Sequence, residues 1–465
     1  MKIGSHGQAA LWKSPRGIPL PYAGEDDRTG APGLIVSLSG IRGVPNRDLS
    51  LEDVSRFAAN FGRAVGSNKF LLARDSRTTG TAVSRSAAAG LLSLGATVLD
   101  YGIISTPALF RESRMRKLPA VMVTASHNEP EFNGLKFIDD GTGIGESILE
   151  AVVGRETPRS GFAGGLMKSA GTPRYVADIV ERFGAGTCEG VEAAVDLGGG
   201  AAISHAVPLL SKLGCHVTSL NDTYSIFARR IDPVADDLDL LVRTVKSKGC
   251  DIGLGFDCDG DRLVVVDSEG RKRTGDYMLT LALSRLLAET GEKQVVVSMD
   301  TTQAVDDVAG KSGCRVARSK VGEANVVGAM KRVGARLGGE GSSGGLIDGT
   351  FNHCRDSMLA AVAIVQELKV RGRSFYRSVP VYHQERVALQ LQKAKALKAM
   401  KKLAREYDEV DTTDGLRVAL PQKSWVLIRP SGTEDVVRVS AEASSPARAA
   451  SLVESFAKRL KELSR

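Results

Sequence analysis

The sequence lacks the features that define several large classes of protein. No uninterrupted apolar run approaches the ~20 residues that a membrane-spanning helix needs. Residues 1–33 hold no apolar segment of the ~7–15 residues found in a signal peptide, so a flexible extension is expected there. The six cysteines form no C-x-x-C pair, which excludes a zinc site and a disulfide framework and is typical of a reducing cytoplasm. Basic residues form no tract interleaved with aromatic ones, so neither nucleic acid nor a membrane is expected as a partner.

What the chain has is length and an ordinary composition. Its 465 residues exceed what one hydrophobic core can organise, and about 150 residues per domain predicts three or four domains. Hydrophobic residues make up 42% and charged residues 25%, as in globular proteins. The formal net charge is +8, from 62 basic and 54 acidic residues. A phosphorylated small molecule as substrate explains this positive balance.

One pattern of strands and helices occurs three times along the chain. In the first copy, a strand at 69–73, a helix at 79–94 and strands at 96–99 and 120–123 lead into a polar loop. The second copy has strands at 193–197, 216–220 and 251–256, with a helix ending at 213, and the third has strands at 294–299, 314–317 and 335–338, with a helix at 303–311. Such alternation predicts mixed, mostly parallel sheets with helices on both faces.

The C-terminal part follows a different pattern. Strands are expected at 415–419, 424–428 and 436–442, followed by an amphipathic helix at 447–463, and the basic stretch 390–406 is interpreted as a solvated helix face. The predicted fold class is therefore α/β, with three similar mixed-sheet α/β domains and a smaller α+β C-terminal domain around a central cleft. The expected boundaries are 1–33 for the extension and 34–165, 166–272, 273–380 and 381–465 for the four domains.

The first polar loop lies in the stretch Val-Thr-Ala-Ser-His-Asn-Glu-Pro-Glu-Phe-Asn-Gly-Leu-Lys at 123–136. Ser126 follows a buried strand directly, among polar residues that cannot all be core. Taken alone, a serine next to a histidine is equally typical of a turn. Ligands gather at the carboxyl ends of strands in sheets of this kind, so Ser126, Asp257 and Glu340 are expected to face one cleft.

The second loop, Gly-Phe-Asp-Cys-Asp-Gly-Asp-Arg at 255–262, predicts a metal site. Asp257, Asp259 and Asp261 alternate, and the intervening glycine allows a turn that lets the carboxylates converge on one cation. Ligation by oxygen alone favours Mg²⁺. A calcium loop is excluded because position 12 is Ser268 rather than glutamate, and a metal-free surface turn is the other alternative. Arg262 is placed to hold a phosphate oxygen.

Two further loops are suited to a sugar and to a phosphate. In Gly-Gly-Glu-Gly-Ser-Ser-Gly-Gly at 338–345, the Glu340 carboxylate can accept hydrogen bonds from two adjacent hydroxyl groups. In Arg-Pro-Ser-Gly-Thr-Glu at 429–434, guanidinium, hydroxyl and backbone N–H groups can hold a phosphate dianion. The candidate phosphate ligands are Arg429, Ser431, Gly432 and Thr433, with Arg438 adding charge.

Taken in this order, the four loops resemble those of the α-D-phosphohexomutase family, over residues 34–465. The resemblance implies that Ser126 carries a phosphate that completes the shell of one Mg²⁺ ion. Arg42 and His127 would surround this serine, although Arg42 has an alternative role in capping a helix, and Lys136 would act as the base. The implied reaction interconverts hexose 6-phosphate and hexose 1-phosphate. A hexose 1,6-bisphosphate is both intermediate and activator, and the enzyme is a monomer or homodimer.

The sugar loop departs from the bacterial pattern, in which Gly-Glu is followed by x-Ser-Gly-His. This chain has no histidine there. The sequence does not indicate which residue would make the contact that this histidine makes in the bacterial members. The Gly-Gly ending and the segment 320–323 look more like archaeal-type members.

For the substrate, the resemblance favours phosphoglucosamine mutase, with Ser342 facing the C2 substituent, and phosphomannomutase/phosphoglucomutase is the alternative. A phosphatase and a non-catalytic sugar-phosphate sensor are further alternatives. The sensor is disfavoured because Ser126, the three aspartates and Arg429 are all retained.

Overall fold

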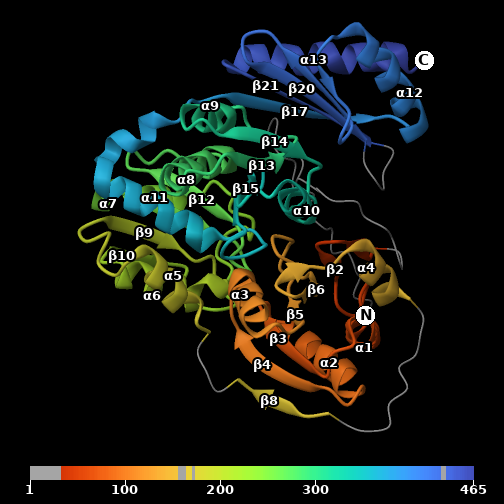
Figure 1. Ribbon diagram of the computed structural model, residues 1–465, viewed down its shortest axis with the longest axis vertical. Helices are drawn as coiled ribbons and strands as arrows, with labels where there is room; N and C mark the ends of the chain where they lie inside the picture. Colours follow the sequence, from red (N-terminus) through yellow and green to blue (C-terminus); the bar gives the residue numbers. More distant parts are fainter. Residues whose placement is uncertain (1–32, 155–163, 170–172, 431–435) are drawn as a thin grey trace, which may run out of the picture.

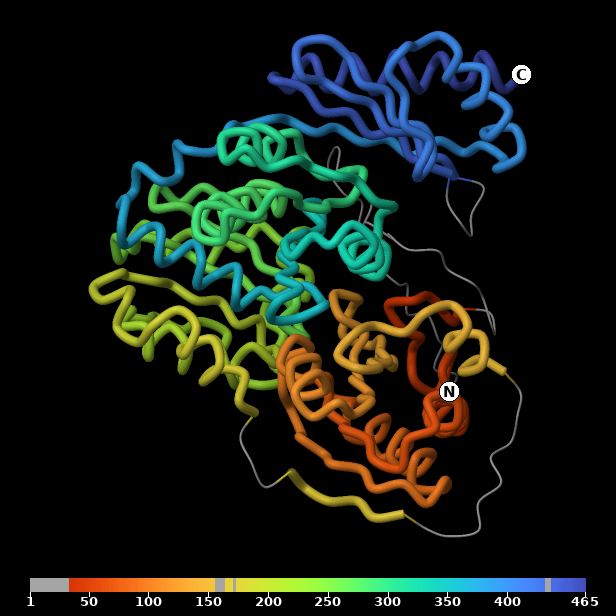
Figure 2. The backbone as a smooth tube through the Cα atoms, in the orientation of Figure 1, coloured from red at the N-terminus to blue at the C-terminus, as the bar shows by residue number. Residues whose placement is uncertain are grey.

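Four β-sheets organise the computed structural model, which describes residues 33–154, 164–169, 173–430 and 436–465 (Figure 1). The sheets have eight, four, four and five strands in chain order. Helices accompany each sheet, and the chain passes from one sheet to the next in sequence order (Figure 2). The predicted fold class, three mixed-sheet α/β domains and a smaller C-terminal α+β domain, is confirmed. The domains are numbered here by their sheets. All but one residue of the expected extension 1–33 lies outside the described residues, and the exact boundaries stay predictions.

The first three sheets share one arrangement of four strands. The strand order is β4-β3-β5-β6 in the first, β10-β9-β11-β12 in the second and β14-β13-β15-β16 in the third. Three strands are parallel, and the last pairs antiparallel with its predecessor through a hairpin. The strands are β3 (Lys69–Arg74), β4 (Thr97–Ile103), β5 (Ala120–Val123), β6 (Asn133–Asp139), β9 (Glu192–Asp196), β10 (His216–Leu220), β11 (Ile252–Phe256), β12 (Leu263–Asp267), β13 (Gln294–Ser298), β14 (Arg315–Ser319), β15 (Leu337–Glu340) and β16 (Gly345–Asp348).

The threefold repeat is confirmed, but the sequence missed the fourth strand of each copy. The strands β6, β12 and β16 are almost wholly buried, so they show no polar and apolar alternation to reveal them. As a result, the three polar loops are hairpin turns between a parallel and an antiparallel strand. Glu340 is the last residue of β15, because this strand runs two residues beyond its predicted end.

Helices cover both faces of these sheets. In the first domain, α1 begins after Ser50, whose side chain accepts the backbone N–H of Asp53, and ends at Gly66 in the left-handed conformation. The first domain also contains β1 (Ile35–Ser37), β2 (Gly40–Gly43), β7 (Thr142–Gly143) and β8 (Leu166–Lys168). The helices of the three domains are α1 (Leu51–Val65), α2 (Gly80–Leu92), α3 (Thr106–Arg116), α4 (Glu146–Val153), α5 (Tyr175–Phe183), α6 (Ala206–Lys212), α7 (Asp239–Lys248), α8 (Gly275–Thr290), α9 (Ala304–Lys311), α10 (Glu323–Val333) and α11 (Ser357–Arg371), with a 3-10 turn at Ala201–Ser204.

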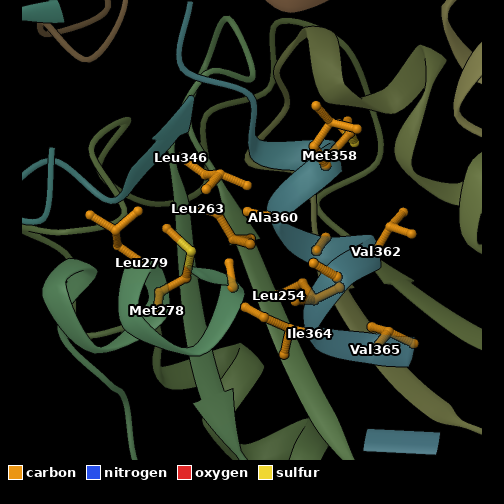
Figure 3. Packing of buried hydrophobic residues seen from close by; sticks show 14 of the residues in the cluster. Leu254, Leu263, Met278, Leu279, Leu346, Met358, Ala360, Val362, Ile364 and Val365 are labelled. Atoms are coloured by element: carbon orange, nitrogen blue, oxygen red, sulfur yellow. The ribbon is translucent and has the colours of Figure 1, made fainter. Parts of the chain in front are cut away.

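Helix α11 connects the second and third domains through a shared core. It is apolar nearly all round, and a helix of this kind must be buried on all sides. In Figure 3, Ile364 of α11 lies by Leu254 of β11, and Ala360 of α11 lies by Leu263 of β12, with Leu346 of β16 nearby. Burial of this one helix therefore joins the two domains, and their hairpin loops are held in a fixed relation.

The fourth domain has a core of its own. Its antiparallel strands lie in the order β17-β21-β20-β19-β18, with two helices packed on the sheet. The elements are β17 (His383–Gln390), α12 (Lys393–Leu403), β18 (Val410–Asp411), β19 (Leu416–Leu420), β20 (Ser424–Pro430), β21 (Val436–Ala443) and α13 (Pro446–Leu463), with a 3-10 turn at Ala404–Glu406. A further 3-10 turn, Gly372–Ser378, follows α11 and packs into the core that α11 shares with the earlier domains. The three predicted strands and the C-terminal helix are confirmed. The basic stretch forms the end of β17 and α12, whose lysines are exposed, as expected for a solvated face.

Two observations concern membrane-spanning and disulfide-bonded proteins, two of the classes that the sequence argued against. Among the described residues, no helix is both long and apolar enough to cross a membrane. All six cysteines are described, and each is a free, buried thiol. The expectation of no disulfide framework therefore agrees with the structure.

Candidate active site

Ser126 lies three residues after the end of β5, in the first hairpin loop. It is fully buried, and its φ of +51° places it in the left-handed region that non-glycine residues seldom occupy. Its backbone N–H donates to the hydroxyl of Thr124 at 2.8 Å. A strained backbone held by local hydrogen bonds is typical of functional sites.

A buried arginine that sequence analysis missed holds this loop. The Arg77 guanidinium donates to the carbonyl oxygens of Ser126 at 2.7 Å, Asn128 at 2.6 Å and Phe132 at 2.9 Å. It pairs with Asp75, whose carboxylate lies 3.2 Å away. Arg77 thus satisfies the backbone carbonyls of the loop and fixes its shape. Its position just after β3, at the same sheet edge as the serine loop, was the signal that could have identified it.

Three predicted residues surround the serine. The Ser126 hydroxyl lies 3.4 Å from Nδ1 of His127, and Nε2 of that histidine lies 3.4 Å from Nη2 of Arg262. Arg42 donates to the side chain of Asn128 at 3.1 Å. Burial, Arg262 and Arg42 together hold the pKa of His127 well below its ordinary value, so the imidazole is neutral. Arg42 lies on β2, in contact with the serine loop, rather than at a helix end.

The three aspartates converge in the hairpin between β11 and β12. They are fully buried, and one oxygen from each lies within 4.8 Å of the others. Gly260 supplies the turn with a φ of +70°. Each carboxylate uses one oxygen in a hydrogen bond, Asp257 with its own loop, Asp259 with Thr106 and Asp261 with an arginine. The other oxygen of each is buried without a hydrogen-bond partner, so three oxygens remain to bind a hard cation.

The electrostatics of this hairpin also favour a cation. Burial and the neighbouring carboxylates raise the pKa of Asp257 well above its ordinary value, and the pKa of Asp259 is raised for the same reasons. Burial also acts to raise the pKa of Asp261, but Arg355 and Lys136 lower it by more. Three buried carboxylates this close repel one another, and a divalent cation relieves that repulsion.

Lys136 lies on β6 at the junction of the first three domains. Its Nζ is 3.4 Å from Asp261 and 3.8 Å from Glu323. Burial lowers its pKa, but Glu323, Asp261 and Asp259 raise it by more, so the side chain is an ammonium ion. The predicted role as a base requires a lowered pKa. That role stays a prediction, because two of the groups that raise the pKa are predicted cation ligands.

The sugar loop is tied to the other loops by a second arginine. Glu340 accepts the backbone N–H of Gly322 at 2.7 Å and Nη1 of Arg355 at 3.3 Å. Ser342 lies half-buried in the turn. A cavity of about 230 Å³ opens next to Lys136 and Glu323, between the β7 region and α10. The hairpin loops of the three domains therefore form one contiguous polar site beside a cavity.

The predicted phosphate ligands lie on the fourth domain. Arg429 of β20 and Arg438 of β21 are directly opposite each other in the sheet. Like charges opposite each other are destabilising, and a phosphate dianion between them would relieve this. Arg429 lies 3.6 Å from Asp414, which accepts the backbone N–H of Val321 at 2.9 Å. This contact connects the arginines to the segment before Glu323. The remaining candidates, Ser431, Gly432 and Thr433, lie outside the described residues.

The sequence matches four family patterns in chain order. They are described as phosphoglucomutase/phosphomannomutase alpha/beta/alpha domain I, over residues 34–157, domain II, over 173–270, domain III, over 274–383, and the C-terminal domain, over 386–459. Together they cover most of the chain.

Relatives and solved structures agree with this match. A probable phosphoglucosamine mutase from Methanopyrus kandleri is 32% identical over 443 residues, covering 91% of this chain and 97% of the relative. A phosphoglucomutase/phosphomannomutase from Thermococcus kodakarensis is 30% identical over 456 residues, covering 92% and 99%. The crystal structure of a phosphoglucomutase/phosphomannomutase family protein from Burkholderia thailandensis superposes with a TM-score of 0.83 at 27% identity, covering 92% of this chain and 98% of that one.

Proposed function

The chain belongs to the phosphoglucomutase/phosphomannomutase family, whose members are phosphohexomutases and therefore isomerases, and we propose that it interconverts hexose 6-phosphate and hexose 1-phosphate through a phosphoserine at Ser126. The observation that carries this proposal is the buried serine in a strained loop whose neighbour His127 contacts Arg262 of the aspartate hairpin. Serine, carboxylate cluster and arginines together suit phosphoryl transfer, in which charge on the moving group must be neutralised.

We propose one Mg²⁺ ion as the cofactor. Asp257, Asp259 and Asp261 would hold it through the three oxygens that have no hydrogen bond, with a phosphate on Ser126 as a further ligand. A bound Mg²⁺ would neutralise charge on the phosphoryl oxygens. Carboxylate oxygens alone favour this hard ion over zinc or copper.

The side chains of the site would share the steps as follows. The bond from phosphorus to Oγ of Ser126 breaks while a bond to a sugar hydroxyl oxygen forms, and the hydroxyl proton leaves to a base, for which Lys136 in its neutral form is the candidate. Arg262 and Arg42 would donate hydrogen bonds to the phosphoryl oxygens. Glu340 would accept bonds from two sugar hydroxyls. The return transfer then moves the other phosphate of a hexose 1,6-bisphosphate to Ser126, so this bisphosphate also primes the enzyme.

A phosphate dianion at the far end of the substrate would bind between Arg429 and Arg438, together with Ser431, Gly432 and Thr433. Two guanidinium groups directly opposite each other provide the charge for this. The hydrogen bond from the Val321 N–H to Asp414 would connect these arginines to the third domain.

For the substrate, we propose glucosamine phosphate, which the name of the Methanopyrus relative supports. Ser342, half-buried in the sugar loop, is the candidate contact to the C2 substituent. The Thermococcus relative supports glucose and mannose phosphates as the second candidates. Steady-state kinetics with glucosamine, glucose and mannose 6-phosphates would decide, and turnover of none of the three would contradict the proposed function.

Intact mass of the purified protein tests the covalent step. Incubation with glucose 1,6-bisphosphate should add one phosphate to the wild type and none to Ser126→Ala. Release of free phosphate at the rate of turnover would instead identify a phosphatase. We further propose a cytoplasmic enzyme, in agreement with its six free thiols, that acts as a monomer or homodimer on small sugar phosphates.

A further inference from the structure

Arg355 lies in the segment between β16 and α11, next to the residue that caps α11. It is buried, with only 4% of its surface exposed. Its guanidinium contacts carboxylates from three separate elements, namely Asp261 at 2.9 Å, Glu340 at 3.3 Å and Glu323 at 3.3 Å. One side chain therefore joins the aspartate hairpin, the sugar loop and the start of α10.

The sugar loop is shaped around this side chain. Nη1 of Arg355 also donates to the hydroxyl of Ser343 at 3.2 Å. A Cβ atom at Gly345 would lie 2.2 Å from Cδ of Arg355, so the arginine passes directly over that glycine. The histidine of the bacterial pattern is missing from this loop, and Arg355 supplies a cationic hydrogen-bond donor to it from another element.

The contacts of Glu340 define what Arg355 does. One carboxylate oxygen is held by the N–H of Gly322 and the other by Arg355. A buried carboxylate with both oxygens held has a fixed orientation, whereas loss of its cationic partner leaves an uncompensated charge that must reorient or take up a proton. Because Nη2 of the same guanidinium holds Asp261, the orientation of Glu340 is set relative to the aspartate hairpin.

We propose that Arg355 is a positioning residue, which fixes Glu340 relative to the aspartate hairpin and so determines how strictly the enzyme recognises the hydroxyl groups of its sugar. The proposal rests on the proposed function, in which Glu340 accepts sugar hydroxyls. It assigns to Arg355 no contact with the reacting atoms.

The test compares deoxy substrates in the wild type and in Arg355→Met, which keeps a long side chain and removes the charge. The substrates are glucose 6-phosphate and its 2-deoxy, 3-deoxy and 4-deoxy analogues. We expect removal of a hydroxyl that Glu340 accepts to lower kcat/KM about 10-fold to 100-fold in the wild type. In Arg355→Met, kcat/KM for the parent should fall about 10-fold to 100-fold, while the penalty for the deoxy analogue shrinks below about threefold.

A matched control separates positioning from general destabilisation. Arg273 also pairs with a buried carboxylate, that of Asp267 at 2.9 Å, but does so away from the site. Arg273→Met should lower the melting temperature and leave the deoxy penalties unchanged. The deoxy penalties of the double variant Glu340→Gln/Arg355→Met should equal those of Glu340→Gln alone, because Arg355 affects sugar recognition through that carboxylate.

Two further variants keep the proposal falsifiable if Arg355→Met does not fold. Arg355→Lys keeps the charge with a single donor group, and Gly345→Ala displaces the arginine without changing it, so both should give intermediate penalties. A uniform loss of kcat/KM across all four substrates would overturn the role of Arg355 alone. Absence of turnover of glucosamine, glucose and mannose 6-phosphates by the wild type would overturn the proposed function, and this proposal with it.

Discussion

The aspartate hairpin of the second domain and the arginine pair of the fourth domain are built in different ways. The aspartates are fully buried, and their side chains contact residues of the first and third domains, including Thr106, Lys136 and Arg355. The arginine pair is half-buried on a sheet that has its own core. The difference indicates that the centre of the site is completed by the packing of three domains, whereas the phosphate end is carried by a separately folded part.

Polar contacts and one small apolar cluster join that part to the third domain. In the cluster, Trp425 and Leu427 of β20 pack with Met299. Besides the bond from Val321 to Asp414, Tyr382 donates to Asp307 at 2.6 Å, and Glu442 accepts the N–H of Gln303 at 2.8 Å. An interface that combines polar contacts with one small apolar cluster is compatible with relative motion of domains. We therefore expect changes at the centre to abolish chemistry, and changes at the arginine pair to weaken binding and positioning.

The largest effect should come from Ser126→Ala. This variant removes the group that carries the phosphate, so mutase turnover should fall at least about 10³-fold. Alanine at the same positive φ is no worse than serine, and the melting temperature should stay within about 2 °C of the wild type. Steady-state kinetics and thermal melting check the two expectations. Wild-type activity in this variant would show that changes at the centre of the site do not abolish the chemistry, and would contradict the expected difference between the centre and the arginine pair.

The next largest effect is expected for Asp259→Asn. It removes one anionic ligand, so the Mg²⁺ concentration for half-maximal activity should rise about 100-fold. In EDTA, however, the variant should melt at the same or a higher temperature than the wild type, because it loses charge repulsion among buried carboxylates. A Mg²⁺ titration and melting curves in EDTA measure both. An unchanged Mg²⁺ requirement would mean that the hairpin is only a structural turn.

A smaller effect should follow Arg429→Ala. Loss of one charge-assisted contact costs about 1.5 to 3 kcal/mol, or roughly 10-fold to 150-fold in kcat/KM. Because the contact holds the substrate at its far end, KM should rise and kcat should fall as well. Arg459→Ala, which removes an exposed arginine of the same domain, is the control and should change neither. Values of both parameters within about twofold of the wild type would exclude the arginine pair as the phosphate site.

The last expected effect concerns stability, rather than activity, where the third and fourth domains meet. Burial and Glu442 raise the pKa of the Asp276 carboxyl from 3.8 to about 7. The folded state therefore favours the protonated form, and the resulting stabilisation is complete below pH ~4 and is lost as the pH rises through about 7. Relative to Asp276→Asn, the wild type should lose up to about 4 kcal/mol between pH 4 and pH 8. Melting curves of the two proteins across this range test it, and parallel curves would contradict the raised pKa.

Local sequence was sufficient for most elements of the fold. Strands such as β5 and β10 were predicted at their observed bounds, since short apolar runs bounded by turn residues are typical of buried strands. The threefold repeat followed from the same signals. The aspartate cluster was also predictable, because three carboxylates at alternate positions around a glycine constrain one another locally.

The long-range contacts of the site were decided by the tertiary structure. Arg77 and Arg355 are separated in the chain from the loops that they hold, by 49 residues for Ser126 and 94 for Asp261. No local pattern marks Arg355, and the position of Arg77 after β3 does not indicate which loop it holds. The charge state of Lys136 likewise depends on Glu323 and Asp261, which belong to two other domains. Sequence by itself determined which chemical groups this protein has and which strand precedes each group. Only packing of the domains decided which charges meet, because electrostatic and hydrogen-bond partners depend on distance in space rather than along the chain.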